Sequence, residues 1–185
     1  MKKFVALVCI LGMFMTLPVA AMQESNAVQA ATSSDVKKTE GIVIDGEVGD
    51  TYQVGDLIFE IISDEEIERV MESPETRAST GRFNITLSGD SMSQDFEVTT
   101  SYPWAKVFVS NQGAGDIKFT ITKGSKTGYL VTGSDVTIKA GKSTSVYSTK
   151  PWDPDTYYAN YTCGSANMQG SSACRVASTQ HELDI

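Results

Sequence analysis

Alternation of apolar and polar side chains from residue 81 onward is the strongest constraint on the fold of this chain. In the runs 83–88, 106–109 and 117–122, apolar residues occupy every second position, and Asn, Thr, Ser or Lys fill most positions between them. Successive side chains of a β-strand point to opposite faces, so this period of two predicts strands with one buried face and one solvated face.

Further short runs of the same kind continue the series at residues 92–99, 129–132, 136–139, 144–148, 157–163 and 174–178. Gly and Asn punctuate most of the gaps, and no convincing helical pattern separates the runs. Residues 81–180 are therefore predicted to form an all-β domain, an antiparallel β-sandwich of about eight or nine strands.

The acidic side chains are concentrated ahead of this domain. Residues 22–80 hold 14 acidic and 4 basic side chains, a net charge of −10, whereas residues 81–185 hold 9 of each. A single-sign excess of this size argues against nucleic acid or another polyanion as the partner.

One short helix is predicted within the acidic segment 41–80, over residues 63–73, with short strands before it. Ser63 can accept the first backbone N–H groups, and Glu66 three residues later completes a capping box, while Pro74 ends the helix. Its narrow apolar face indicates a helix packed on its neighbours; the alternative is a docking helix for a partner or a pro-segment.

The amino terminus has the layout of a cleaved secretory signal peptide over residues 1–21. Lys2 and Lys3 precede an uncharged apolar run over residues 4–17, and a site of small residues follows. The run is shorter than the roughly 20 apolar residues of a membrane-spanning helix. The sequence therefore predicts an extracellular product that does not associate with a membrane once the signal peptide is removed.

Two further segments are predicted to lack a fold of their own. Residues 22–40 are rich in Ser, Ala, Gln and Thr without periodicity, which indicates a flexible leader, and cleavage after Ala27 or Ala31 would shorten it. Residues 181–185 read as a terminal tail. A boundary near residues 77–81 separates the acidic segment from the sandwich.

Cleavage of the signal peptide would remove Cys9 and leave Cys163 and Cys174. An even pair of cysteines in an oxidising compartment predicts a disulfide, and a hairpin that places Cys163 opposite Cys174 would put Tyr161 opposite Val176. Zinc is the rival interpretation, but it takes four ligands, and the chain adds one histidine to the two cysteines. No cofactor or metal is expected.

Four aromatic residues are the candidate ligand-binding residues: Tyr102, Trp104, Trp152 and Tyr158. They lie at strand starts or on predicted outward faces, and exposed flat rings suit stacking on sugars or contact with a protein. The alternative is that these rings are partly buried and close the ends of the sandwich.

No catalytic constellation is recognisable, so enzymatic activity is not expected. The single histidine, His181, lies four residues from the carboxyl terminus, and no G-x-S-x-G motif accompanies it. Paired carboxylates for glycoside hydrolysis remain compatible with the sequence. Asp153 and Asp155 flank Pro154 and could hold calcium, although a polar turn is the favoured interpretation.

The segment 142–163 resembles the closing strands of bacterial pre-peptidase carboxyl-terminal sandwich domains, through its turn and the run Asp155-Thr156-Tyr157-Tyr158-Ala159-Asn160-Tyr161. It is also similar to small secreted proteins of Gram-positive bacteria that have no assigned function. Asp155 stands where those domains have a glycine. The resemblance implies a sandwich fold and an accessory, non-catalytic role, and it carries over no functional residue.

Three functions are compatible with these observations. The first is a secreted accessory or binding module for cell-wall glycan, polysaccharide or another protein. The second is a secreted effector or antagonist held inactive by an acidic pro-segment that ends near Ala78. The third, and least favoured, is a small hydrolase.

Overall fold

We analysed a computed structural model of the chain. It describes residues 41–72, 79–164 and 167–183, with the backbone alone for residues 79–82. All of them belong to one compact unit, Lys38–Ile185. The predicted signal peptide (1–21), the predicted leader (22–40), residues 77–78 of the predicted boundary and residues 184–185 of the predicted tail lie outside the described residues.

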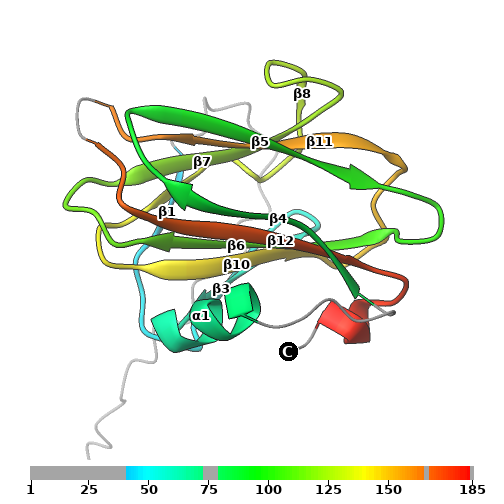
Figure 1. The fold of residues 1–185 in the computed structure, drawn as a ribbon, viewed down its shortest axis with the longest axis horizontal. Helices are drawn as coiled ribbons and strands as arrows, with labels where there is room; N and C mark the ends of the chain where they lie inside the picture. The colour runs from blue at the N-terminus through cyan, green and yellow to red at the C-terminus, as the bar shows by residue number, and fades with distance from the viewer. Residues whose placement is uncertain (1–40, 73–78, 165–166, 184–185) are drawn as a thin grey trace, which may run out of the picture. The chain divides into compact units, whose positions relative to one another are not determined.

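Two sheets make up the described unit (Figure 1). Sheet I contains β1 (Ile42–Ile44), β9 (Val136–Ile138), β7 (Ile117–Lys123), β11 (Asp155–Thr162) and β5 (Ser91–Val98) in that order, and β8 (Tyr129–Leu130) pairs with β7. Sheet II contains β2 (Thr51–Val54), β3 (Leu57–Ile62), β10 (Ser143–Ser148), β6 (Trp104–Asn111), β12 (Gly170–Ala177) and β4 (Ser79–Leu87).

The predicted all-β sandwich is confirmed. The strands β4 to β12 are nine in number among the described residues from Ser79 onward, in agreement with the eight or nine expected. Neighbouring strands run antiparallel, apart from β1 and β9, which are parallel. The inner faces of both sheets share one hydrophobic core.

β7 and β11 follow the predicted alternation most closely. Phe119 and Ile121 of β7, and Ala159 and Tyr161 of β11, point inward and are fully buried. The residues between them carry hydroxyl, amide or ammonium groups and point outward. A period of two in the sequence thus gives one apolar and one polar face to sheet I.

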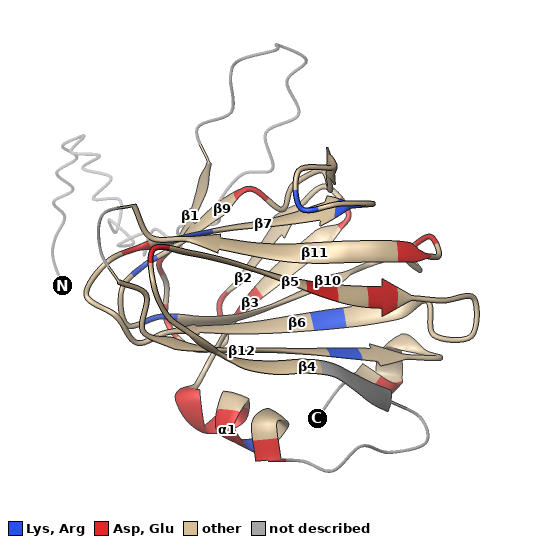
Figure 2. Cartoon of the chain, turned by 45° about the horizontal axis from the view of Figure 1, so that its top comes forward, with Lys and Arg blue, Asp and Glu red and all other residues tan. Residues whose placement is uncertain are grey.

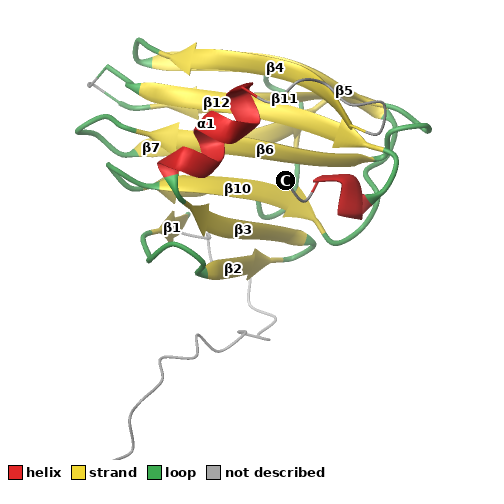
Figure 3. Ribbon diagram, turned by 60° about the horizontal axis from the view of Figure 1, so that its bottom comes forward, coloured by secondary structure: helices red, strands yellow, loops and turns green. Residues whose placement is uncertain are grey.

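β6 and β12 are buried on both faces, because the helices cover the outside of sheet II (Figure 3). The helix α1 (Asp64–Glu72) contacts β6 and β12, and the 3₁₀ helix η1 (Gln180–Leu183) contacts the same two strands. Beneath α1, a second apolar cluster forms from Ile62, Ile67, Val70, Phe108 and Ala173.

The predicted helix is confirmed as α1, within one residue of its expected ends. The hydroxyl of Ser63 accepts a hydrogen bond from the Glu66 backbone N–H at 3.2 Å, which is the expected amino-terminal cap. Asp64, Glu65 and Glu66 fill the first turn, where the helix dipole favours negative charge. Figure 2 colours the acidic positions of the helix red, and the helix packs on sheet II through its apolar stripe.

The acidic segment 41–80 does not precede the sandwich but contributes strands to both of its sheets. β1 pairs with β9 in sheet I, and β3 lies between β2 and β10 in sheet II. Phe59 of β3 is fully buried in the common core. The change in charge near residue 80 is therefore a change in surface composition within one folded unit.

The predicted cysteine hairpin is wrong. Cys163 directly follows β11 of sheet I, whereas Cys174 lies in β12 of sheet II, and no disulfide joins these two buried residues. The connection between the strands binds the β4–β5 turn instead, since Met168 N–H donates to the Gly89 carbonyl at 2.7 Å. Because β11 and β12 lie in different sheets, the side chain of Tyr161 faces β12 across the core, and its hydroxyl lies 2.7 Å from Ser172 Oγ.

Part of the expected tail is packed. Leu183 of η1 is 2 % exposed. The Glu182 carboxylate accepts a hydrogen bond from the Ser178 hydroxyl at 2.7 Å and others from the backbone N–H groups of Thr179 and Ser178, each at 3.0 Å, and these bonds lower its pKa. Residues 180–183 therefore form a capped turn of helix against sheet II.

Candidate functional site

The four aromatic residues expected to bind a ligand do not share a surface. Tyr158 of β11 follows the core residue Tyr157 and therefore points to the outside of sheet I. Trp104 starts β6 and points to the outside of sheet II, the opposite face. Tyr102 lies in the β5–β6 turn and packs partly against the core.

The prediction that the Trp152 ring is exposed is wrong. It is 7 % exposed and belongs to the core cluster. Its indole meets Tyr157 edge to face at 4.8 Å between ring centroids, and Phe96 at 6.0 Å. The stretch around Trp152 reads as a polar turn because of its prolines and aspartates, and nothing in it signals that the ring turns inward.

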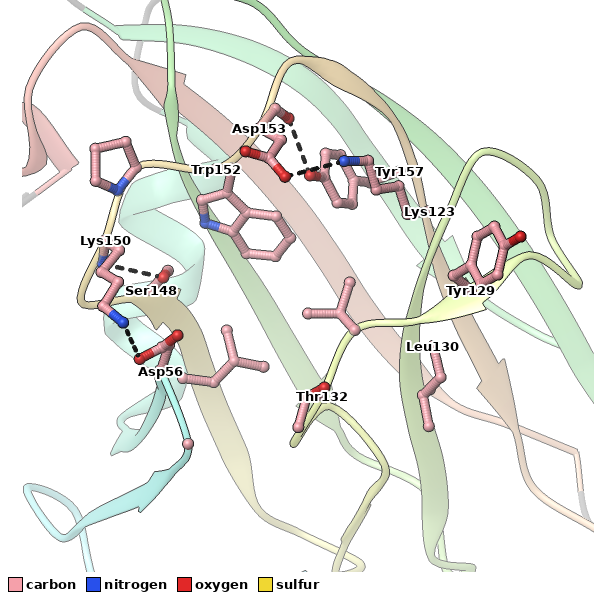
Figure 4. A pocket seen from close by; sticks show the side chains of 14 residues that line it. Asp56, Lys123, Tyr129, Leu130, Thr132, Ser148, Lys150, Trp152, Asp153 and Tyr157 are labelled. Carbon is pink, nitrogen blue, oxygen red and sulfur yellow. Dashed lines mark hydrogen bonds and ion pairs between the residues drawn. The ribbon is translucent and has the colours of Figure 1, made fainter.

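Trp152 forms the floor of an open hollow of about 550 Å³ at one end of the sandwich (Figure 4). The walls come from the β2–β3 turn, from β8 with the loop after it, and from the β10–β11 loop. Its aromatic and charged lining residues include Asp56, Lys123, Tyr129, Lys150, Trp152 and Asp153. We call this site the Tyr129 hollow. Its volume lies within the roughly 300–1,000 Å³ typical of small-molecule sites.

Tyr129 stands on the rim and is 86 % exposed. It pairs with Lys123, which in turn pairs with Tyr157 of β11. Side chains of directly paired residues lie on the same face of a sheet, so these three line one side of the site. Sequence reasoning missed Tyr129; the signal available was an aromatic residue directly after the glycine-bounded turn 124–128.

The β7–β8 hairpin that displays Tyr129 is tightly hydrogen-bonded. The Thr122 hydroxyl donates to the Ser125 carbonyl at 2.7 Å, and Gly128 N–H donates to the same oxygen at 2.9 Å. A side chain at Gly128 would collide with the Lys123 carbonyl, so the turn requires glycine there. The hairpin therefore presents an exposed ring on a fixed support.

The loop that follows β8 is also anchored. The buried Ser134 hydroxyl donates to the carbonyls of Ile121 and Val131, at 3.1 and 2.8 Å, and accepts from Ile121 N–H. At Gly133, φ is +88°, and a side chain there would press on the Val54 carbonyl of β2. These contacts hold the β8 side of the hollow against both sheets.

Two ion pairs lie on opposite sides of Trp152 (Figure 4). Lys123 Nζ lies 3.2 Å from Asp153 Oδ2, and Lys150 Nζ lies 3.0 Å from Asp56 Oδ1. The hydrogen bond to Asp153 raises the pKa of Lys123. Burial raises the pKa of Tyr157, whose hydroxyl donates to the Asp153 carbonyl at 2.9 Å.

Lys123 occupies the position where calcium would be expected between Asp153 and Asp155. Its ammonium is 3.2 Å from the first carboxylate and 3.9 Å from the second. Among the described residues, no three His, Cys, Asp or Glu side chains gather as a metal site. His181 lies in η1 and is exposed, whereas Cys163 and Cys174 are buried.

No family model matches the chain, and no curated protein and no solved structure matches it either. The resemblance to pre-peptidase carboxyl-terminal domains therefore stays a prediction. None of the helices in the described residues is both long enough and apolar enough to cross a membrane. The class that these observations define is an all-β sandwich with an aromatic hollow at one end.

Proposed function

We propose that this chain is a secreted, non-catalytic module that binds a glycan through the Tyr129 hollow. The observation that carries the proposal is the Tyr129 ring, 86 % exposed on a hydrogen-bonded hairpin beside an aromatic floor. A single exposed ring is common on protein surfaces, but a ring fixed beside an aromatic floor and several polar groups has the layout of a ligand site.

The polar groups around Tyr129 fit a ligand rich in hydroxyl groups. Asp153 and Lys150 have side chains that are 84 % and 69 % exposed, so an oxygen or hydroxyl of a sugar can reach them. An exposed ring offers a flat apolar surface to the C–H face of a pyranose. The hollow therefore combines one apolar platform with several fixed donors and acceptors, as small-molecule sites commonly do.

The same charged groups support a binding role over hydrolysis. Each aspartate of the hollow faces a lysine ammonium at 3.2 Å or less. A glycosidase needs two carboxyl groups that are free to act on the glycosidic bond, whereas both carboxylates of the hollow are engaged in ion pairs with lysine. Export rests on the predicted signal peptide at residues 1–21.

The test compares two tyrosines on sheet I. Tyr129→Ala is expected to weaken glycan binding, measured by titration calorimetry after a glycan-array screen, by at least about tenfold, since it removes the stacking platform. Tyr158→Ala on the outer face of the same sheet is the matched control and should leave the affinity unchanged. Circular dichroism spectra verify that both variants fold.

Two outcomes would contradict the proposal. Equal affinity of Tyr129→Ala and the parent chain would place binding elsewhere. The absence of binding to every glycan on the array would reject the glycan as ligand and leave a protein partner to be sought.

A further inference from the structure

Building on the glycan-binding function proposed above, we infer that the Tyr129 hollow selects uncharged saccharides over anionic ones. The charged residues that line it, within the described part of the chain, are two lysines and two aspartates: Lys123, Lys150, Asp56 and Asp153. The formal charge of the lining is therefore zero. The two pairs lie on opposite sides of the hollow (Figure 4).

Each lysine that could attract an anion is already engaged by a carboxylate. Lys150 lies 3.0 Å from Asp56, and Lys123 lies within 4 Å of both Asp153 and Asp155. A ligand carboxylate that approached the Lys123 ammonium would also come close to the carboxylates of Asp153 and Asp155. Its attraction to the ammonium, about 1 kcal/mol at 4 Å in water, would be offset by repulsion of similar size.

A neutral hydroxyl group has no such conflict. It can donate to an aspartate oxygen and accept from the neighbouring ammonium, so it joins an ion pair without breaking it. The side chains of Asp153 and Asp56 are 84 % and 61 % exposed, which leaves their remaining lone pairs open to such a donor.

The floor adds a hydrogen-bond donor. The indole N–H of Trp152 is buried and has no hydrogen-bond partner among the described residues. In Figure 4 this nitrogen is drawn on the side of Ser148 and Lys150. An unsatisfied buried donor costs about 1–3 kcal/mol, and a sugar oxygen or a bridging water that accepts from it removes that cost.

The charge of the whole chain acts in the same direction. Its formal net charge is −8 at pH 7. The long-range field therefore disfavours the approach of a polyanion, and it does so most strongly at low ionic strength.

The experiment uses the full secreted chain with Trp104→Phe, so that Trp152 is the one remaining tryptophan of the two in the sequence. Its fluorescence reports occupancy of the hollow. The probes are neutral hexasaccharides of glucan, mannan and galactan type, and hexagalacturonate as the anionic counterpart. We expect the best neutral probe to bind at least about tenfold more tightly than the uronate, with an affinity that changes less than about twofold up to roughly 0.5 M salt.

A charge variant tests the cause. The double variant Asp56→Asn with Asp153→Asn gives the lining a formal charge of +2, and it should strengthen uronate binding by about tenfold at low salt, with the gain lost at high salt. Asp95→Asn, at an exposed position of β5 outside the hollow, is the control and should change neither affinity.

The outcomes separate this inference from the proposed function. Uronate binding as tight as neutral binding, and abolished by Tyr129→Ala, overturns neutral selectivity and leaves the glycan-binding function in place. Failure of the double variant to favour uronate also overturns the stated cause. Binding of an extended peptide through Tyr129, with no saccharide bound, overturns both.

Discussion

The outer faces of the two sheets show how similar strand patterns lead to different surfaces. On sheet II, α1 and η1 cover the centre, and Phe108 lies 1 % exposed beneath α1. On sheet I no described helix covers the outer face, and side chains bond to one another: Ser93 Oγ donates to Asn160 Oδ1 at 2.7 Å, and Asn160 Nδ2 donates to Thr122 at 3.1 Å. Apolar residues on an outer face therefore go with a covering helix, whereas polar residues that bond to one another do not need one.

Charged residues under the cover of sheet II are accommodated rather than excluded. Arg175 is 7 % exposed, and its guanidinium donates to the Val70 carbonyl near the end of α1 at 2.5 Å. Lys106 is 6 % exposed, with its ammonium over the rings of Phe108 and Tyr147 and 4.0 Å from Glu60. The aliphatic parts of both side chains are buried, and their charged groups contact Val70 of α1 and Glu60 of β3. These contacts hold the acidic segment against β6 and β12.

Removal of residues 1–78 should have the largest effect on stability, because it uncovers part of the outer face of sheet II. It deletes α1 from the cover of sheet II together with β1, β2 and β3, and with them the buried side chains of Ile44, Leu57, Phe59, Ile61, Ile62, Ile67 and Val70. At about 1.5–3 kcal/mol each, the loss of roughly 10–20 kcal/mol exceeds the stability of a typical domain. A chain that starts at residue 79 should show no cooperative thermal transition by circular dichroism.

The same prediction bears on the alternative of an acidic pro-segment. The intact mass of the mature protein, isolated from its native source, should place its first residue before Ile42. A mature start near residue 78, together with a cooperative transition of the shortened chain, would instead revive that alternative.

Substitution of one aromatic residue on each outer face tests whether the two faces differ in packing. Phe108→Ala opens a cavity between α1 and sheet II and should lower the free energy of unfolding by about 3–5 kcal/mol in urea titrations. Tyr158→Ala on the open face of sheet I should cost within about 1 kcal/mol, since its ring is half-buried and no described helix covers it. Equal losses for the two variants would show that the outer faces do not differ in this way.

Local patterns predicted the strands and the helix well, because each depends on neighbours close in the sequence. The alternation in β7 and the Ser63–Glu66 cap needed no knowledge of distant residues. The pairing of strands did depend on it. A hairpin between β11 and β12 satisfies the alternation as well as the observed arrangement does, in which β11 lies between β7 and β5 and β12 lies between β6 and β4 in the other sheet.

The candidate site was less predictable for the same reason. Exposure of Tyr129 and burial of Trp152 follow from the way the β7–β8 hairpin and the β10–β11 loop meet at one end of the sandwich. Both residues stand in polar, glycine- or proline-containing stretches, so composition gives them the same expected environment. The packing of the two sheets places Tyr129 on the rim of the hollow and Trp152 on its floor.

Tyr161→Phe tests the inner faces, where the two sheets are alike and where the Tyr161 hydroxyl meets Ser172. At neutral pH the variant should lose about 0.5–1.5 kcal/mol of unfolding free energy, the usual contribution of one hydrogen bond. Ser172 keeps its own bond to the Phe108 carbonyl at 2.6 Å, so no buried group is left without a partner.

The larger signature of Tyr161→Phe lies above pH 10. Burial raises the pKa of Tyr161, so the unfolded chain releases this proton before the folded one does. The stabilisation is complete below the ordinary tyrosine pKa of about 10 and is lost above it, at up to about 1.4 kcal/mol per pH unit. Urea titrations across this range should show a shallower decline for the variant, with a remaining slope from Tyr157, whose pKa is also raised by burial. Parallel declines would mean that Tyr161 ionises as readily in the folded chain as in the unfolded one, which is incompatible with a hydroxyl sealed between two packed sheets.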